Sequence, residues 1–303
     1  MSVEICLQVR GDYAGVLQAA RWAESNGLAA FALPDHYLAS PTDTNAAAWD
    51  HVVHLAGLAR ETQTIELVDL VSPVTFRHPA VAAKMAATIY DMAAGRFLFG
   101  LGTGWLEEEH SLFGIDFPSQ SARFDLLEEQ LAYLAALGRG ESFAGNHYRL
   151  EGFESAPRFA VPLVIGGTGG RRTPELAGRF CRELNLFPRS GDDLAPRIEV
   201  CRQAAKAAGR DPDEVRLSFT CLPVAGEDDA AYRRALEKTA REYDRTPSVT
   251  EERLAARGVP FGTPTRIKAR LDELEAIGIT RLYLQAGTND PAELEPVVAP
   301  YLS

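Results

Sequence analysis

The chain has 303 residues, of which 46% are hydrophobic, and its formal net charge is −11. This length and hydrophobic content predict one large core or two domains. The negative charge argues against nucleic acid as a partner, and no apolar run reaches the roughly 18 residues that a membrane span needs. Because the amino terminus leads directly into the strand-like run 3–9, we expect no signal peptide and a cytoplasmic protein. The four widely spaced cysteines predict small buried hydrophobic side chains in a reducing compartment.

Strand-like and helix-like segments alternate along the whole chain. Short β-branched or apolar runs predict strands, and apolar residues at spacings of three and four predict helices. The predicted strands are 3–9, 29–33, 65–71, 97–101, 161–165, 184–187, 215–221 and 280–285. The predicted helices are 13–26, 46–60, 79–92, 122–137, one from 174, 194–208, 265–277 and one after the last strand.

This alternation of strands and helices predicts an α/β TIM barrel. A doubly wound open sheet is the alternative. Two segments lie outside the repeat: an aromatic hairpin at about 141–150 and a charged helical insertion at 227–257. No stretch has the composition of a linker, so the residues 1–303 are expected to form one domain.

Unusual residues stand where three consecutive strands end, and sheets of this kind bind ligands beyond the carboxyl ends of their strands. Asp35 and His36 follow the second strand, and Asp69 lies near the end of the third. The fourth strand ends in Gly102, Thr103, Gly104 and Trp105, where the glycines let a ligand approach the backbone. A histidine can carry a proton near neutral pH. Each of these features also has a simpler interpretation. His36 would be a histidine hydrogen-bonded at the start of a loop, Asp69 a solvated carboxylate, and Gly102–Gly104 a tight turn.

A glycine-rich loop follows the predicted strand 161–165 and precedes a helix. It consists of Gly166, Gly167, Thr168, Gly169 and Gly170, with Arg171 next. Backbone N–H groups at a helix amino terminus, beside an arginine, favour a phosphate. Glycine loops without phosphate are the alternative.

Other polar residues receive weaker interpretations. Glu107, Glu108 and Glu109 open a helix, and such a charge run is typical of a solvated first turn. His51 and His54 lie one helical turn apart, but no third ligand at suitable spacing follows, so no metal site is predicted. Trp49 and His51 are instead expected to line or pack near the pocket.

Four fragments carry a family resemblance through their joint order and spacing. They are the runs 73–79, 82–86, 95–97 and 100–105. Together they resemble the bacterial-luciferase-like oxidoreductases, and most closely the branch that uses the deazaflavin coenzyme F420. The resemblance covers nearly the whole chain.

The resemblance implies a TIM barrel in which the insertion after the seventh strand covers the site. It implies F420 as cofactor, with FMN as the alternative, and hydride transfer between the ring and a small organic substrate. His36 would donate or accept the proton. The cofactor would lie against Asp69, Gly102, Thr103, Gly104 and the loop Gly166–Arg171. The substrate would lie against Asp35, Trp49 and Trp105.

Two residues depart from the family pattern. Members usually have a small hydroxyl residue at the position of Asp69, beside a cis peptide that would fall at Asp69–Leu70. If Asp69 faces the ring, burial should raise its pKa and let it bond the cofactor as an acid. Some deazaflavin dehydrogenases of the family have a catalytic glutamate where this chain has Trp105, so that role is not transferred.

The resemblance also implies a homodimer that pairs through the helical segments 52–60 and 80–91. Two other functions remain open. One is an FMN monooxygenase that uses reduced flavin and oxygen. The other is a non-catalytic barrel that only holds flavin.

Overall fold

The computed structural model describes residues 3–39, 46–191, 194–242 and 249–302. Within these residues, parallel strands form a closed barrel in the order β3-β2-β1-β11-β10-β9-β8-β5, and β5 pairs with β3 to close it. The predicted TIM barrel is confirmed. The strands are β1 (Glu4–Gln8), β2 (Ala30–Leu33), β3 (Glu66–Asp69), β5 (Phe97–Gly102), β8 (Leu163–Gly167), β9 (Glu183–Leu186), β10 (Arg216–Cys221) and β11 (Arg281–Gln285).

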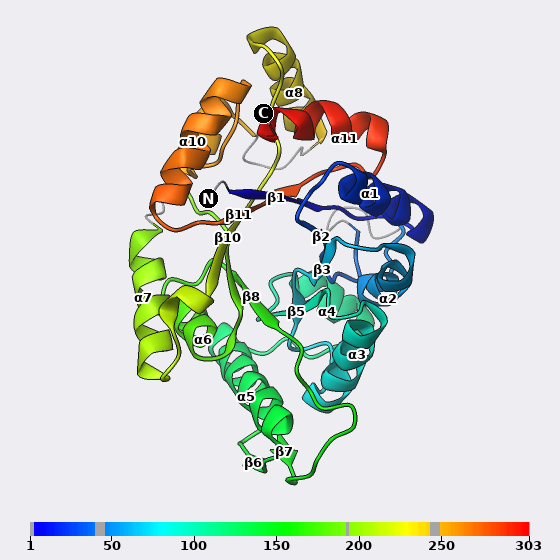
Figure 1. Cartoon of the computed structure of the whole chain (residues 1–303), viewed down its shortest axis with the longest axis vertical. Coiled ribbons are helices and arrows are strands. Elements are labelled where there is room, and N and C mark those ends of the chain that lie inside the picture. The colour runs from blue at the N-terminus through cyan, green and yellow to red at the C-terminus, as the bar shows by residue number, and fades with distance from the viewer. Residues whose placement is uncertain (1–2, 40–45, 192–193, 243–248, 303) are drawn as a thin grey trace.

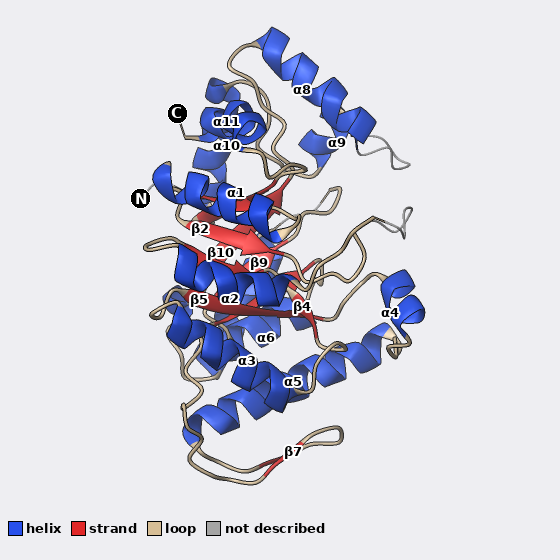
Figure 2. Ribbon diagram, turned by 90° about the vertical axis from the view of Figure 1, so that its right-hand side faces the viewer, coloured by secondary structure: helices blue, strands red, loops and turns tan. Residues whose placement is uncertain are grey.

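Helices surround the barrel, which Figure 1 shows from the amino ends of its strands. The helices of the repeat are α1 (Tyr13–Ser25), α2 (His51–Glu61), α3 (Pro79–Met92), α5 (Gln120–Arg139), α6 (Arg172–Phe180), α7 (Ala195–Ala207), α10 (Pro264–Ala276) and α11 (Pro291–Val298). A short helix, α4 (Glu107–Phe113), follows β5. In Figure 2 the strands run toward the side that carries α4, so that side is the mouth of the barrel.

Two predicted boundaries differ from the structure at the mouth. The second helix begins at His51 rather than at residue 46, because the Asp50 carboxylate accepts hydrogen bonds from the N–H groups of Val52 and Val53, both at 3.1 Å. The third strand is interrupted after Asp69 and resumes as β4 (Ser72–Pro73). The cis peptide bond lies at Leu70–Val71, one bond beyond the predicted position.

Both insertions take the predicted kind of structure. Residues 143–150 form an antiparallel hairpin of β6 (Phe143–Ala144) and β7 (Arg149–Leu150). The segment 227–257 contains α8 (Asp229–Glu242) and α9 (Glu251–Ala256), while its residues 243–248 lie outside the described ones.

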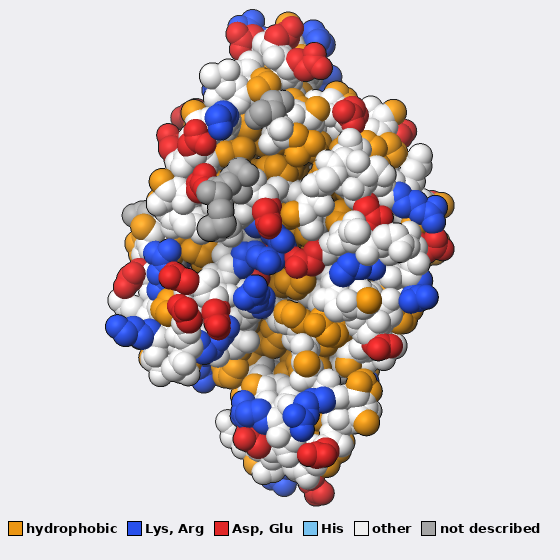
Figure 3. Space-filling view, viewed as in Figure 1, with side chains coloured by type: hydrophobic (Ala, Val, Ile, Leu, Met, Phe, Trp, Pro, Cys, Tyr) orange, Lys and Arg blue, Asp and Glu red, His pale blue; other side chains and the backbone are white. Residues whose placement is uncertain are grey.

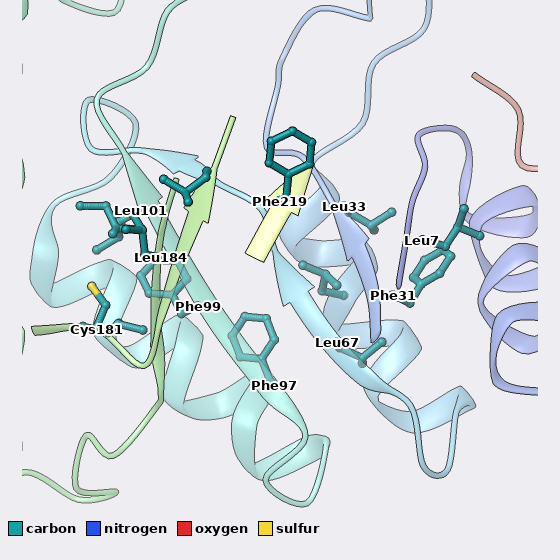
Figure 4. Packing of buried hydrophobic residues seen from close by; sticks show 14 of the residues in the cluster. Leu7, Phe31, Leu33, Leu67, Phe97, Phe99, Leu101, Cys181, Leu184 and Phe219 are labelled. Carbon is teal, nitrogen blue, oxygen red and sulfur yellow. The ribbon is translucent and has the colours of Figure 1, made fainter. Parts of the chain in front are cut away.

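Two hydrophobic clusters lie on the two faces of the sheet. The larger one fills the space between strands and helices and includes Leu67, Phe97, Phe99 and Phe219 (Figure 4). The smaller one fills the barrel interior and consists of Cys6, Ala30, Ala32, Val68, Leu70, Leu98, Val164 and Tyr283, with Ala29 and Val71 packed against it. Successive strand side chains point to opposite faces. Since Leu67 faces the helices and Val68 the interior, the side chain of Asp69 faces the helices.

Charged side chains close the amino end of the barrel. Arg281 is 3% exposed and lies 2.5 Å from Glu66 and 2.8 Å from Glu4. Arg216 joins the cluster through Glu66 and Glu183, at 3.1 and 3.3 Å. Figure 3 shows this face, where arginine or lysine and acidic side chains gather near the centre.

All four cysteines are buried and free, as the sequence predicts. Among the helices of the described segments, none combines the length and the apolar character that crossing a membrane requires.

Candidate active site

A histidine–glutamate pair stands at the mouth of the barrel. His36, in the loop after β2, places Nδ1 3.0 Å from Oε1 and 3.2 Å from Oε2 of Glu109 on α4. The backbone N–H of Tyr37 donates to Oε2 of the same carboxylate at 2.9 Å. A carboxylate accepts the Nδ1 proton, so Nε2 carries the lone pair of the neutral ring.

Glu109 was missed from the sequence, where it was interpreted as part of a solvated run. Its neighbours Glu107 and Glu108 are exposed as predicted, but the Glu109 side chain is fully buried. A buried carboxylate needs bonding partners, and the His36 ring and the Tyr37 N–H supply them. The turn of the helix α4 buries Glu109 and leaves Glu107 and Glu108 exposed. Three identical residues in a row do not indicate which of them is buried.

The two predicted aromatic walls are exposed at the mouth. Trp105 is 59% exposed, and its ring lies 5.6 Å from the ring of His36 in an edge-on arrangement. Trp49 is 45% exposed and lies 6.2 Å from the ring of His54. The structure therefore brings Trp105 to His36, while Trp49 borders the helix α2.

Asp35, predicted to line the substrate pocket, lies beneath it instead. Its side chain is fully buried and forms an ion pair with Arg77. The Arg77 guanidinium also donates to the Tyr37 hydroxyl at 3.2 Å and to Asp50 at 3.1 Å. Asp35 thus ties the loop of His36 to the loop after β4 and contacts no open space.

Asp69 shares a single hydroxyl with Asp35. The Ser72 Oγ lies 2.7 Å from Oδ2 of Asp35 and 2.6 Å from Oδ2 of Asp69. A hydroxyl has one hydrogen to donate, so one of the two carboxyls must itself donate and be protonated. Arg77 pairs with Asp35, while burial, and then the charge of Asp35, raises the pKa of Asp69 well above its usual range. Asp69 is therefore the protonated member.

This arrangement alters the predicted role of Asp69. The raised pKa agrees with the expectation from burial. Its side chain, however, is 0% exposed on the helix-facing side of β3, bonded to Ser72. It does not point into the barrel mouth, so it supports the loop after β4 rather than meeting a ring directly.

The glycines near the end of β5 leave room for a neighbouring side chain of the protein as well as for any ligand. A Cβ on Gly100 would lie 2.7 Å, and one on Gly102 2.8 Å, from side-chain carbons of Val71. Gly166 on β8 faces the same side chain, at 3.2 Å. Packing around Val71 therefore accounts for Gly102 and Gly166, two predicted cofactor contacts. Thr103 and Gly104 follow, half-buried, and Gly104 has φ +72.

The predicted phosphate loop lies where β8 meets α6. Among the described residues, no side chain caps α6 at Arg171, so the N–H groups that open this helix lack a side-chain cap. Arg197 is 2% exposed and donates to the Gly167 carbonyl at 2.7 Å, which holds the loop in place. A Cβ on Gly170 would lie 3.8 Å from Nη2 of Arg189. The loop thus combines open amide groups with nearby cationic charge, which suits an anion.

His51 and His54 are buried at the start of α2. His51 is 4% exposed, and its ring lies 5.6 Å from that of His54. Among the residues that the structure describes, neither ring nitrogen of His51 has a hydrogen-bond partner. In the described part of the chain, no group of three His, Cys, Asp or Glu side chains is placed to hold a metal ion.

A closed parallel barrel with a histidine–carboxylate pair and a glycine-rich loop before a helix at its carboxyl end is an architecture that TIM-barrel oxidoreductases have. The family model of the luciferase-like monooxygenases matches residues 2–281. The chain belongs to this family.

Among its sequence relatives is the pyrimidine monooxygenase RutA of Escherichia coli (strain SMS-3-5 / SECEC), which is 29% identical over 246 residues. That match covers 76% of this chain and 66% of the relative, so the chain spans just under two thirds of the relative's length.

Solved structures share the fold at low identity. A coenzyme F420-dependent tetrahydromethanopterin reductase from Methanopyrus kandleri aligns with a TM-score of 0.76 and 17% identity, covering 98% of this chain and 97% of that one. The oxygenating constituent of 3,6-diketocamphane monooxygenase from Pseudomonas putida, in complex with FMN, has a TM-score of 0.76 and 18% identity, with 99% and 97% covered. The same barrel therefore serves both cofactors.

Proposed function

We propose that the chain is a coenzyme F420-dependent oxidoreductase that moves a hydride between the deazaflavin ring and a small organic substrate. The arrangement of His36 and Glu109 at the mouth supports this proposal most directly. The fragments around β4, α3 and β5 resemble the deazaflavin branch of the family, which favours F420 over FMN.

The bound cofactor would supply the hydride chemistry. The protein would hold its phosphate with the open N–H groups at the start of α6, beside Arg171 and Arg189. Arg197 would keep the Gly167 carbonyl turned away from the anion by bonding it. Thr103 and Gly104 would border the ring at the end of β5.

His36 would handle the proton that accompanies the hydride. With Nδ1–H donated to Glu109, Nε2 is the atom that meets the substrate oxygen or nitrogen. The Glu109 carboxylate stabilises the imidazolium when Nε2 is protonated and fixes the ring orientation. Trp105, against the His36 ring, would form a wall of the substrate pocket.

An FMN-dependent monooxygenase is the second candidate. The sequence likeness to a pyrimidine monooxygenase favours it. A ring and a phosphate would occupy the same places in both cases, so the mouth geometry serves either cofactor.

A parallel titration with F420 and with FMN tests the proposal. We expect quenching of the tryptophan fluorescence by F420 at the lower concentration, and oxidation or reduction of F420 by a substrate. Tight FMN binding with oxygen consumption by the reduced flavin, and no F420 binding, would instead establish the monooxygenase.

The phosphate loop is best tested at Gly170. Gly167 has φ +154, so any side chain there strains the backbone regardless of a ligand. Gly170 has no such constraint, and the nearest atom to its Cβ position is 3.8 Å away. We predict that Gly170→Asp weakens cofactor binding at least tenfold, since its carboxylate repels the phosphate. Gly170→Ala is the matched control and should bind nearly normally. Equal affinities of the two variants would remove the assignment.

A further inference from the structure

Within the described segments, the buried ring of His51 has no hydrogen-bond partner at either nitrogen. The side chain is 4% exposed at the first position of α2, and neither Nδ1 nor Nε2 is bonded by a described residue. In a neutral imidazole, one ring nitrogen donates a hydrogen bond and the other accepts one. Buried polar groups in folded proteins are bonded in the great majority of cases. An exception at the mouth of a candidate active site calls for a functional reason.

His110, on α4, shows how this fold treats a structural histidine. It is 0% exposed, and both of its nitrogens are bonded. Nε2 lies 2.7 Å from the Thr75 hydroxyl, and Nδ1 lies 2.8 Å from the Leu106 carbonyl. Both histidines are buried, and of the two only His51 lacks a bonding partner in the described part of the chain.

The surroundings of His51 belong to the mouth. Its ring stands edge-on to His54 at 5.6 Å, and His54 in turn faces Trp49. Asp50, the residue before it, bonds Arg77 beneath the site. Burial, and then the nearby positive charges of His54, Arg10 and His36, lowers the pKa of His51 to about 4. The imidazole is thus neutral at physiological pH and keeps one donor and one acceptor.

We propose that His51 is a substrate-binding residue whose neutral imidazole hydrogen-bonds an uncharged oxygen group, a carbonyl or a hydroxyl, on the reacting substrate. This inference rests on the proposed function, because it assigns a substrate contact beside the same candidate site. His51 binds and orients the oxygen, while His36 with Glu109 exchanges the proton.

The chemistry of hydride transfer fits a neutral partner. When a carbonyl carbon gains a hydride, its oxygen gains a proton and becomes a hydroxyl, and the reverse step removes both. The carbonyl only accepts a hydrogen bond, whereas the hydroxyl donates and accepts. A neutral imidazole can bond both species, by N–H in the first case and by either nitrogen in the second. An imidazolium could only donate.

Thermal unfolding of His51→Phe and His110→Phe tests the first half of the proposal without any cofactor or substrate. Removing unpaired polar atoms from His51 should raise the midpoint temperature by about 2–4 °C. Removing bonded atoms from His110 should lower it by at least as much. His51→Leu serves as a second variant in case the larger ring of phenylalanine overpacks the site. A fall in both His51 variants contradicts the proposal, because His51 then stabilises the free protein.

The second half is tested by NMR of protein labelled with ¹⁵N in its histidine rings. The probes are acetone, propan-2-ol, cyclohexanone and 2-pyrrolidinone, each added to the protein with and without cofactor. We expect the His51 ring nitrogens to shift on addition of at least one probe, while those of His110 stay fixed. Silence of His51 toward every probe overturns the inference. Because this NMR measurement requires no turnover, its result does not depend on which cofactor the enzyme uses.

Discussion

The two ends of the barrel each bury a cluster of arginine and carboxyl groups, but the clusters are balanced differently. At the amino end, Arg216 and Arg281 contact Glu4, Glu66 and Glu183. At the mouth, Arg77 alone faces Asp35 and Asp50, with Asp69 behind Ser72.

The difference suggests a division of roles, with the amino-end cluster serving stability and the cluster at the mouth serving the candidate active site. At the amino end, two guanidinium groups face three carboxylates, and each arginine contacts more than one of them. At the mouth, a single guanidinium stands beside three carboxyl groups, and the single Ser72 hydrogen forces one of them to keep a proton. Like charges in a buried site favour this outcome. The amino end closes the barrel, whereas the mouth holds a proton beneath the candidate active site.

The largest effect is expected at the amino end. Arg281→Met removes the more deeply buried of the two arginines that face Glu66 and Glu183, and removing one member of a buried ion pair costs about 3–5 kcal/mol. We predict a loss of that size in the free energy of unfolding, measured by urea denaturation. Exposed Arg21, paired with Glu61, gives the control, since Arg21→Met should cost at most about 1 kcal/mol. Similar losses in the two variants would show that the amino-end cluster is not a stabilising one.

A smaller loss is expected at the mouth. Arg77→Met removes the partner of Asp35, but Asp50 is 38% exposed and Asp35 can take up a proton in compensation. We predict a loss of about 2 kcal/mol at pH 7 that shrinks toward pH 5, as protonation neutralises the carboxyls. A loss independent of pH would mean that the charges of these aspartates do not matter.

The smallest effect is a gain in stability at Asp69. Its pKa is raised in the folded state, so the stabilisation by its proton is complete below the usual carboxyl pKa. That stabilisation is lost as pH rises through the folded pKa. Asp69→Asn keeps the shape of the protonated acid without this dependence. The variant should match the parent at pH 4 and exceed it at pH 8 by about 1 kcal/mol in the free energy of unfolding.

Asp69→Ser, which shortens the side chain, is the comparison variant and should show no gain. If Asp69→Asn instead loses stability increasingly toward high pH, Asp69 is ionised in the folded protein and the shared-proton description is wrong.

The barrel could be predicted from the sequence because its signals are local. Strand and helix periodicity lies within each segment, so all eight strands were found, with no end displaced by more than two residues. Boundaries that depend on a particular cap were less accurate, as at Asp50, where the side chain sets the first turn of α2. The homodimer stays a prediction.

The contacts of the site could be predicted only where they follow from strand order. His36 and Trp105 both follow strands at the mouth, and their rings lie 5.6 Å apart. Asp69 was given the wrong direction, because both faces of β3 carry apolar residues and the alternation of Leu67 and Val68 does not say which face is interior. The partnership of Asp35 with Arg77 joins residues 42 apart in the chain, and no local pattern encodes it.

The measurement that tests the central claim most directly is a comparison of His36→Ala with the parent enzyme, in which cofactor affinity and turnover per bound cofactor are determined separately. General acid–base catalysis contributes a factor of about 10² to 10⁴. We predict that turnover falls by that order and that the dissociation constant of the cofactor stays nearly unchanged, because the loop proposed to hold the phosphate follows β8, three strands away from β2 around the barrel. Glu109→Gln should lower turnover less, since it disturbs the His36 ring without removing it. A collapse of cofactor affinity with unchanged turnover per bound cofactor would contradict the account and make His36 a cofactor-binding residue.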